Sequence, residues 1–151
     1  FFPLRDIKVL ATDIDEGAMD KAKLGLYNEK SLENLPKGFK EKYFTKVESS
    51  YKISEDIKKC VEFKKMDLLK DRFPMNVDLL TCRNVMIYFT EDAKELLYSK
   101  FNNSLSDRGV LFVGSTEQII MPEKYKLKSV RTFFYEKIKW NLNIGGWKFG
   151  Y

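Results

Sequence analysis

The chain has 151 residues, of which 44% are apolar and 15% aromatic, and it carries a net charge of +5. These values indicate one globular domain with a packed core and exclude a disordered chain. The sequence contains two cysteines and no histidine, which excludes Cys–His and Ser–His–Asp catalysis and nearly all zinc sites. No stretch approaches the roughly 18 apolar residues that a membrane span needs. The lone cysteines favour a cytoplasmic location.

The chain opens with an apolar run that predicts a strand over residues 7–11 and a helix that begins at Glu16. Asp15 is placed to cap this helix, which leaves Asp13 at the tip of the strand. An acidic residue at such a tip commonly accepts hydrogen bonds from both hydroxyls of a ribose. A second turn or capping role is the alternative for Asp13.

Residues 39–57 mix aromatic side chains with lysines, glutamates and serines. Residues 43–47 and 51–53 predict two short strands that form an antiparallel hairpin. We expect a small β insertion, whose aromatic side chains serve packing, within a domain that spans residues 1–138. Residues 139–151 show no period and are assigned no structure.

The next strands are predicted over residues 60–66, which end at Asp67, and over residues 77–81. The second run is almost entirely apolar, which is typical of a strand buried on both faces of a parallel sheet. It is followed by the polar run 82–84. Because ligands bind outside the carboxyl ends of strands in open α/β sheets, the tips at Asp13, Asp67 and 82–84 predict one ligand site.

The remaining elements complete an α/β pattern. Thr90 is the expected N-cap of a helix over 91–105, whose apolar residues recur four apart. A turn at 107–109 leads into a short buried strand at 110–113, and 125–138 predicts a closing hairpin. Alternating strands and helices predict a mainly parallel sheet with an antiparallel edge.

Four blocks of this sequence resemble, in order and spacing, the catalytic domain of the CheR-type chemotaxis methyltransferases. They are ATDIDEGAMDKAKLGLY (11–27), MDLL (66–69), LLTCRNVMIYF (79–89) and GVLFVGSTEQI (109–119). The resemblance extends over about residues 8–137, and its ATDID and CRNVMIYF runs are specific to the family. It implies a Rossmann-like class I methyltransferase fold and transfer of a methyl group from S-adenosylmethionine to glutamate side chains of chemoreceptors, with S-adenosylhomocysteine as product.

The resemblance also implies which residues hold the cofactor. Asp13 would bind the ribose hydroxyls. Asp67 and Leu68 fall where the family holds the adenine, although many members have asparagine at the position of Asp67. Arg83 and Asn84 would lie beside the methionine part. The β insertion matches the subdomain with which the family grips its receptor.

For catalysis, the resemblance implies that Tyr88 lies near the reactive methyl group, where Tyr88 or Arg83 orients the incoming carboxylate. A glutamate carboxylate is ionised at neutral pH, so neither a strong base nor a metal ion is expected. Structural alternatives are an ion pair for Arg83, a turn for Asn84 and a core position for Tyr88. Cys82 is expected to be a packing residue and not a nucleophile.

The sequence departs from the family at its start. The glycine-rich cofactor loop, which follows the first strand of the family's sheet, and the helical domain before it have no counterpart. We therefore expect an incomplete domain without that strand and the next helix. Such a domain has unpaired sheet edges that favour dimers, and it should show weak cofactor binding and little activity.

Two other functions were weighed. A non-catalytic module that docks a receptor or another protein is the alternative. A nucleic-acid methyltransferase ranks lower, because the lysines are scattered and residues 84–88 lack the Pro-Pro-Tyr run that presents a flipped base. We expect no nucleic-acid partner and no membrane insertion.

Overall fold

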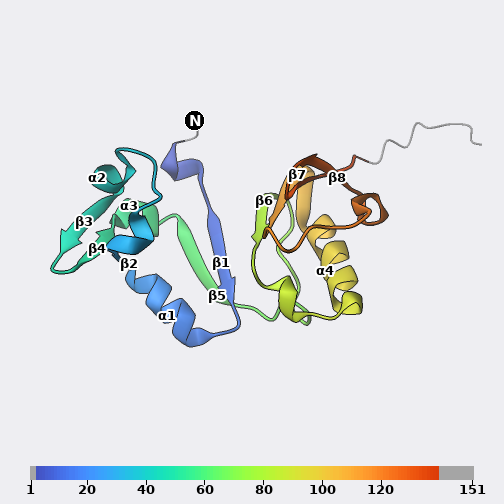
Figure 1. Cartoon of the computed structure of the whole chain (residues 1–151), viewed down its shortest axis with the longest axis horizontal. Coiled ribbons are helices and arrows are strands. Elements are labelled where there is room, and N and C mark those ends of the chain that lie inside the picture. The colour runs from blue at the N-terminus through green and yellow to red at the C-terminus, as the bar shows by residue number, and fades with distance from the viewer. Residues whose placement is uncertain (1–2, 140–151) are drawn as a thin grey trace, which may run out of the picture. The chain divides into compact units, whose positions relative to one another are not determined.

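The computed structural model describes residues 3–139 (Figure 1). Their contacts divide the chain into a first unit, which ends at Asp67, and a second unit, which begins at Leu68. No helix in the described part is long and apolar enough to cross a membrane. Residues 140–151, nearly all of the unassigned tail, lie outside the described residues, and the predicted domain boundary at residue 138 stays a prediction.

The first unit contains a two-stranded parallel sheet. Strand β1 (Val9–Asp13) pairs with β5 (Val61–Lys65). After β1 the chain enters α1 (Glu16–Leu24), which begins where Asp15 caps it and ends at Gly25, whose φ of 67° is left-handed. The predicted strand and helix are therefore confirmed, with the strand shifted by two residues.

An antiparallel sheet of three strands completes the first unit. Its order is β2 (Leu26–Asn28), β4 (Ser50–Ile53) and β3 (Phe44–Val47). The β3–β4 hairpin is the predicted one, whereas β2, which has three residues, was not predicted. The other elements of this unit are short helices: η1 (Leu4–Asp6), η2 (Glu29–Leu32), α2 (Phe39–Tyr43) and α3 (Glu55–Lys58).

The aromatic side chains of this sheet pack against one another. The rings of Tyr27 and Phe44 meet edge to face at 5.7 Å, and Phe39 meets Tyr43 at 5.5 Å. These contacts confirm the packing role expected for the aromatic residues of the β insertion.

The second unit is a four-stranded mixed sheet with the order β6–β7–β9–β8. Strands β6 and β7 are parallel, and β9 and β8 add an antiparallel edge, as predicted. The elements are β6 (Val77–Cys82), η3 (Met86–Tyr88), α4 (Glu91–Ser104), β7 (Leu105–Val113), η4 (Pro122–Tyr125), β8 (Leu127–Arg131) and β9 (Phe134–Lys137).

The turn predicted at 107–109 lies within β7, which begins at Leu105. The register with β6 shifts there, so that Val77 pairs with Leu105 and Leu79 pairs with Val110. Arg108 has a left-handed φ of 64°, and a Cβ on Gly109 would lie 3.0 Å from the carbonyl oxygen of Ser106 and 2.7 Å from that of Val77. The chain therefore turns at this irregularity before it pairs with β6 again, and Gly109 permits the close approach of the two strands.

The core of the second unit is an eleven-residue cluster that joins α4, the sheet and the segment after β7: Cys82, Met86, Leu97, Tyr98, Phe101, Leu105, Leu111, Val113, Ile119, Leu127 and Tyr135. Helix α4 packs on β7 (Figure 1). Burying each large apolar side chain contributes about 1.5–3 kcal/mol, so this cluster is the main stabilising feature of the unit. The packing role predicted for Cys82 is confirmed.

Strands β1 and β6 each keep one edge that has no strand partner among the described residues. The missing first strand and dimer formation stay predictions. The expectation that residues 77–81 are buried on both faces is wrong, since Leu79 is 58% exposed. The reason is that β6 is the edge strand of its sheet within the described part, so its surface is only partly covered.

Candidate functional site

The tip of β1 presents an exposed carboxylate. Asp13 is the last residue of the strand, and its Oδ1 accepts a hydrogen bond of 2.9 Å from the main-chain N–H of Asp15. The side chain of Asp15 in turn accepts from the N–H groups of Gly17 and Ala18, at 2.8 and 3.3 Å. Asp13 therefore has both the predicted tip position and the alternative turn role. Its carboxylate is exposed to solvent and suited to bind hydroxyl groups.

Asp67 and Leu68, the residues expected near the adenine, lie where the two units meet in the sequence. Asp67 is half-buried and ends the first unit, whereas Leu68 begins the second unit and packs against its core. The Nζ of Lys100 on α4 donates to the carbonyl oxygens of Leu68 and Leu69, at 2.6 and 3.1 Å. Lys100, which the sequence analysis did not single out, thereby fixes the main chain of this segment.

The tip of β6 carries the other predicted residues. Arg83 and Asn84 are exposed, and the Arg83 guanidinium lies 5.0 Å from the centre of the Phe112 ring on β7. Asn84 has a φ of 58°, so the turn role weighed for it is confirmed. Tyr88, at the end of η3, is 81% exposed, which makes the core alternative for this tyrosine wrong. Three predicted side chains thus lie within one six-residue segment.

A buried carboxylate that the sequence analysis missed holds this segment. Glu117, in the segment after β7, is 5% exposed. Its Oε1 accepts hydrogen bonds from the N–H groups of Val85 and Met86, at 2.8 and 2.6 Å. Its Oε2 accepts from those of Asn84 and Gly114, at 2.7 and 2.9 Å. Residue 117 belongs to a block that carries the family resemblance, but no local pattern reveals its partners.

The thiol beside this carboxylate is inert. Burial, and secondly the negative charge of Glu117, raise the pKa of Cys82 to about 12. Since the thiolate is the reactive form, this cysteine is not a nucleophile at neutral pH. The tip of β6 therefore offers polar side chains for binding and no group for covalent catalysis.

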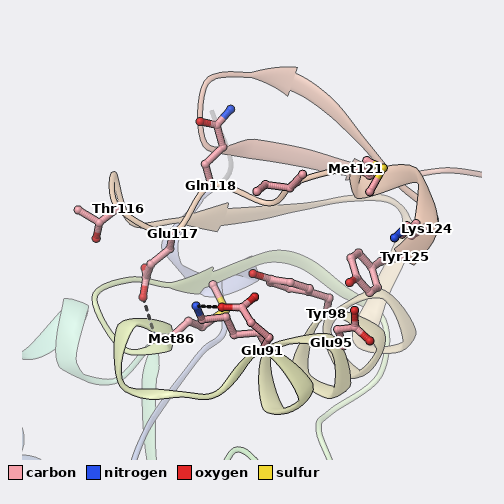
Figure 2. Close-up of a pocket in the computed structure, with 12 residues that line it drawn as sticks. Met86, Glu91, Glu95, Tyr98, Thr116, Glu117, Gln118, Met121, Lys124 and Tyr125 are labelled. Atoms are coloured by element: carbon pink, nitrogen blue, oxygen red, sulfur yellow. Dashed lines mark hydrogen bonds and ion pairs between the residues drawn. The ribbon is translucent and has the colours of Figure 1, made fainter.

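A pocket of about 280 Å³ lies in the second unit between α4 and the segment after β7 (Figure 2). The rings of Tyr98 and Tyr125 meet in it at 4.8 Å, and burial together with Glu91 raises the pKa of Tyr98 to about 12. None of the predicted site residues lines this pocket. Those at the strand tips, Asp13 in the first unit and Arg83 and Asn84 in the second, are exposed.

Comparison with known proteins identifies the family. Residues 3–134 match the sequence profile described as CheR methyltransferase, SAM binding domain. The chain belongs to this family. The family membership and the mixed α/β architecture establish a Rossmann-like methyltransferase fold, as predicted.

Named relatives agree with the CheR assignment. The chain is 38% identical over 133 residues to a chemotaxis protein methyltransferase of Listeria innocua, covering 88% of this chain and 51% of the relative. It is 40% identical over 131 residues to one of Borreliella burgdorferi, covering 80% and 46%. A TehB-like SAM-dependent methyltransferase structure from Corynebacterium glutamicum is 17% identical, with a TM-score of 0.49 over 85% of this chain and 65% of that one. The chain spans about half the length of the curated relatives it matches.

The side chains present fit the S-adenosylmethionine implied by the CheR family. The exposed carboxylate of Asp13 accepts hydrogen bonds, as ribose hydroxyls require. Arg83 and Asn84 offer donors and an acceptor for the charged groups of an amino acid. Leu68 supplies an apolar side chain that is only half-buried.

Proposed function

We propose that this chain is the cofactor-binding part of a protein-glutamate O-methyltransferase that modifies chemoreceptors. One observation carries the proposal: within a match to a SAM-binding domain over residues 3–134, both parallel strand pairs end in exposed polar side chains. These are Asp13 on β1 and Arg83 with Asn84 after β6. Polar tips of parallel strands are where sheets of this class bind nucleotide-like ligands.

Each tip has a role in cofactor binding under this proposal. Asp13 accepts hydrogen bonds from the ribose hydroxyls. Asp67 binds the polar edge of the adenine and Leu68 contacts its face, with the Leu68 main chain held by Lys100. The methionine part is bound by the Arg83 guanidinium and the Asn84 amide, which pair with its carboxylate and ammonium groups.

S-adenosylmethionine supplies, when bound, a methyl group on a positively charged sulfur. The accepting glutamate needs no base, because its carboxylate is ionised at neutral pH. What the protein has to supply is alignment and exclusion of water. The Tyr88 hydroxyl, on a side chain that is 81% exposed, and the Arg83 guanidinium orient the incoming carboxylate by hydrogen bonds.

The role of Tyr88 has a direct test in methyl transfer to a receptor fragment by a version of the protein extended at its amino end. Tyr88→Phe should lower kcat by roughly 10- to 100-fold, because it removes one orienting hydrogen bond. Affinity for S-adenosylhomocysteine should not change. Tyr125→Phe, which removes a hydroxyl elsewhere in the second unit, is the matched control. Unchanged turnover of Tyr88→Phe would remove Tyr88 from the mechanism.

The partner and location follow from the same proposal. The receptor's cytoplasmic domain is the substrate, the chain acts in the cytoplasm, and the β2–β4–β3 sheet contacts the receptor. The unpaired edges of β1 and β6 allow pairing with a second copy.

The second candidate, a docking module without chemistry, is favoured by one observation in the first unit. Phe39 and Tyr27 beside the β2–β4–β3 sheet are 46% and 38% exposed, and aromatic side chains with exposed surface are typical of interaction sites. This candidate predicts binding to a receptor fragment without binding to the cofactor.

Calorimetric titration with S-adenosylhomocysteine separates the two candidates. We expect weak binding by the 151-residue chain and low-micromolar binding by a version extended at its amino end. Asp13→Asn should weaken binding by roughly tenfold or more, because it removes a charged acceptor, whereas Asp20→Asn on α1 should not. Equal affinities of both versions would contradict the expected missing strand. Failure of both to bind would favour the docking module.

A further inference from the structure

The carboxylate of Glu117 is the most completely bonded buried charge in the second unit's described part. Its two oxygens accept four main-chain hydrogen bonds of 2.6–2.9 Å, from Asn84, Val85, Met86 and Gly114. Three of these donors are consecutive residues. Consecutive N–H groups that point inward form a concave site for an anion, and here the anion is a side chain of the same chain.

Burying an ionised carboxylate costs free energy unless its oxygens are bonded. All four hydrogen bonds to Glu117 are charge-assisted, which makes them roughly twice as strong as neutral ones. The same bonds satisfy the N–H groups of Asn84 and Val85, which follow β6, and that of Met86, which begins η3 and has no partner within so short a helix. The carboxylate and the segment therefore depend on each other.

The space around the Glu117 carboxylate fits these hydrogen bonds. A Cβ on Gly114 would lie 2.4 Å from Oε2 of Glu117 and 2.9 Å from Oδ1 of Asn84. A glycine at this position therefore lets both side chains approach the end of β7. The φ of 58° at Asn84 turns the chain so that the next N–H groups face Glu117.

The view of the second unit shows how the two segments are joined. Glu117 reaches from the segment after β7 to the main chain at Met86, where a dashed line marks the hydrogen bond (Figure 2). Met86 is fully buried in the core, whereas Tyr88, two residues later, is 81% exposed. The segment is thus held at one end by Glu117 and presents its other end to solvent.

We propose that Glu117 is a positioning residue, whose carboxylate acts as an internal anion that shapes residues 84–86 and thereby orients Arg83, Asn84 and Tyr88 toward the cofactor. The second part of this proposal, the orientation of these side chains toward the cofactor, rests on the proposed function.

Amide resonances test the first part of the proposal. In the ¹⁵N-labelled 151-residue chain, N–H groups bonded to a carboxylate resonate far downfield. Glu117→Gln replaces one acceptor oxygen by a donor, so the amide protons of 84–86 and 114 should shift upfield. Glu123→Gln, an exposed glutamate of η4, is the matched control and should leave these resonances unchanged. Resonances that stay in place in Glu117→Gln would overturn the proposal.

Replacement of the anion distinguishes positioning from general destabilisation. Glu117→Ala leaves a space and four free donors, so added formate should restore the downfield resonances of 84–86, or the folded state where the variant does not fold alone. Chloride at the same ionic strength should restore neither. Absence of any effect of formate on a variant with altered resonances would overturn the internal-anion role.

Affinity for S-adenosylhomocysteine tests the second part, in the version extended at the amino end. Glu117→Gln should raise the dissociation constant by roughly tenfold, and Glu123→Gln should not change it. Altered amide resonances with an unchanged dissociation constant would overturn the orienting role. If the unsubstituted protein binds no S-adenosylhomocysteine, the proposed function fails, and the amide and formate results still decide whether Glu117 shapes the segment.

Discussion

The side-chain hydrogen bonds at the tip of β1 join residues two and three apart, whereas those at the tip of β6 are accepted by a side chain 31 to 33 residues further along the chain. At the first tip, Asp13 and Asp15 bond the turn that they belong to. At the tip of β6, the Glu117 carboxylate accepts hydrogen bonds from the main chain of residues 84–86. The local hydrogen bonds at β1 leave the Asp13 carboxylate exposed to solvent. The hydrogen bonds from Glu117 fix the main-chain conformation of residues 84–86.

The two units also differ in the size of their hydrophobic cores. The eleven-residue hydrophobic cluster belongs entirely to the second unit. The buried apolar side chains of the first unit are Met19, Leu32 and Met66, and its strand β1 exposes Val9 at 46%. Because stability grows with buried apolar surface, we expect the second unit to withstand denaturant better than the first.

The largest expected effect is on the core of the second unit. Phe101 is 1% exposed and packs against Phe73, with ring centres 5.7 Å apart. Phe101→Ala should lower the free energy of unfolding by about 3–5 kcal/mol, since it removes a buried ring and leaves a cavity. Phe39→Ala removes the same atoms from a side chain that is 46% exposed, and should cost below about 1 kcal/mol. Urea denaturation measures both, and equal costs would contradict the comparison.

A smaller loss of stability is expected at Gly114, because the hydrogen bonds of Glu117 need space beside this residue. Gly114→Ala puts a Cβ 2.4 Å from Oε2 of Glu117, so either the carboxylate or the strand has to move. We expect a loss of about 1–3 kcal/mol in urea denaturation, as for other overpacked sites. The loss should be smaller in a Glu117→Gly background, where the closest atom is absent and only the contacts with Oδ1 and N of Asn84, at 2.9 and 3.0 Å, remain. An equal loss in both backgrounds would show that the two residues are not coupled.

An alkaline pH effect is also expected in the second unit. The pKa of Cys82 is raised from 9.0 to about 12 when folded, so the unfolded thiol loses its proton first as pH rises. Stability is fully present below pH 9 and falls above it, by about 1 kcal/mol between pH 9 and pH 10 from this thiol. Chemical denaturation across this range measures the slope, which Cys82→Ala should make shallower. An unchanged slope would contradict the raised pKa.

The two cysteines differ in burial, so the alkylation rate of Cys60 is a control for that of Cys82. Cys60 in the first unit is half-buried, whereas Cys82 is 7% exposed. Iodoacetamide at pH 8 should therefore modify Cys60 at least tenfold faster in the native chain. Mass spectrometry of tryptic peptides reports both rates, and faster modification of Cys82 would contradict its burial.

The smallest effects concern the helix caps. Asp15 accepts two main-chain hydrogen bonds at the start of α1, so Asp15→Ala should cost about 0.5–1 kcal/mol. Thr90 accepts one bond of 3.4 Å from Ala93 at the start of α4, so Thr90→Ala should cost less. Thermal unfolding followed by circular dichroism compares them, and a larger loss in Thr90→Ala would reverse the expected order.

Features that depend on neighbours in the sequence were predicted well. The starts of α1 and α4 follow from the capping side chains of Asp15 and Thr90, and both hairpins follow from alternating apolar residues. The positions of Asp13, Arg83 and Asn84 at strand tips were predicted because an apolar run stops at a polar residue. Each of these signals lies within about five residues.

Features that depend on distant contacts were not predicted. Glu117 and Lys100 look like ordinary charged residues, since their main-chain partners lie about 30 residues away. The sequence does not show that the turn at 107–109 lies inside β7, where Val77 closely approaches Gly109. The exposure of Tyr88 likewise depends on how the segment after β6 is folded by its contact with Glu117.

Amide hydrogen exchange of the unsubstituted 151-residue chain tests the contrast between the tips most directly. The N–H groups of Asn84, Val85 and Met86, bonded to a buried carboxylate, should exchange at least a hundredfold more slowly than that of Asp15, which is bonded to an exposed one. That result would support a β6 tip fixed by Glu117 and a β1 tip whose side-chain hydrogen bonds are local. Exchange at equal rates at the two tips would contradict it.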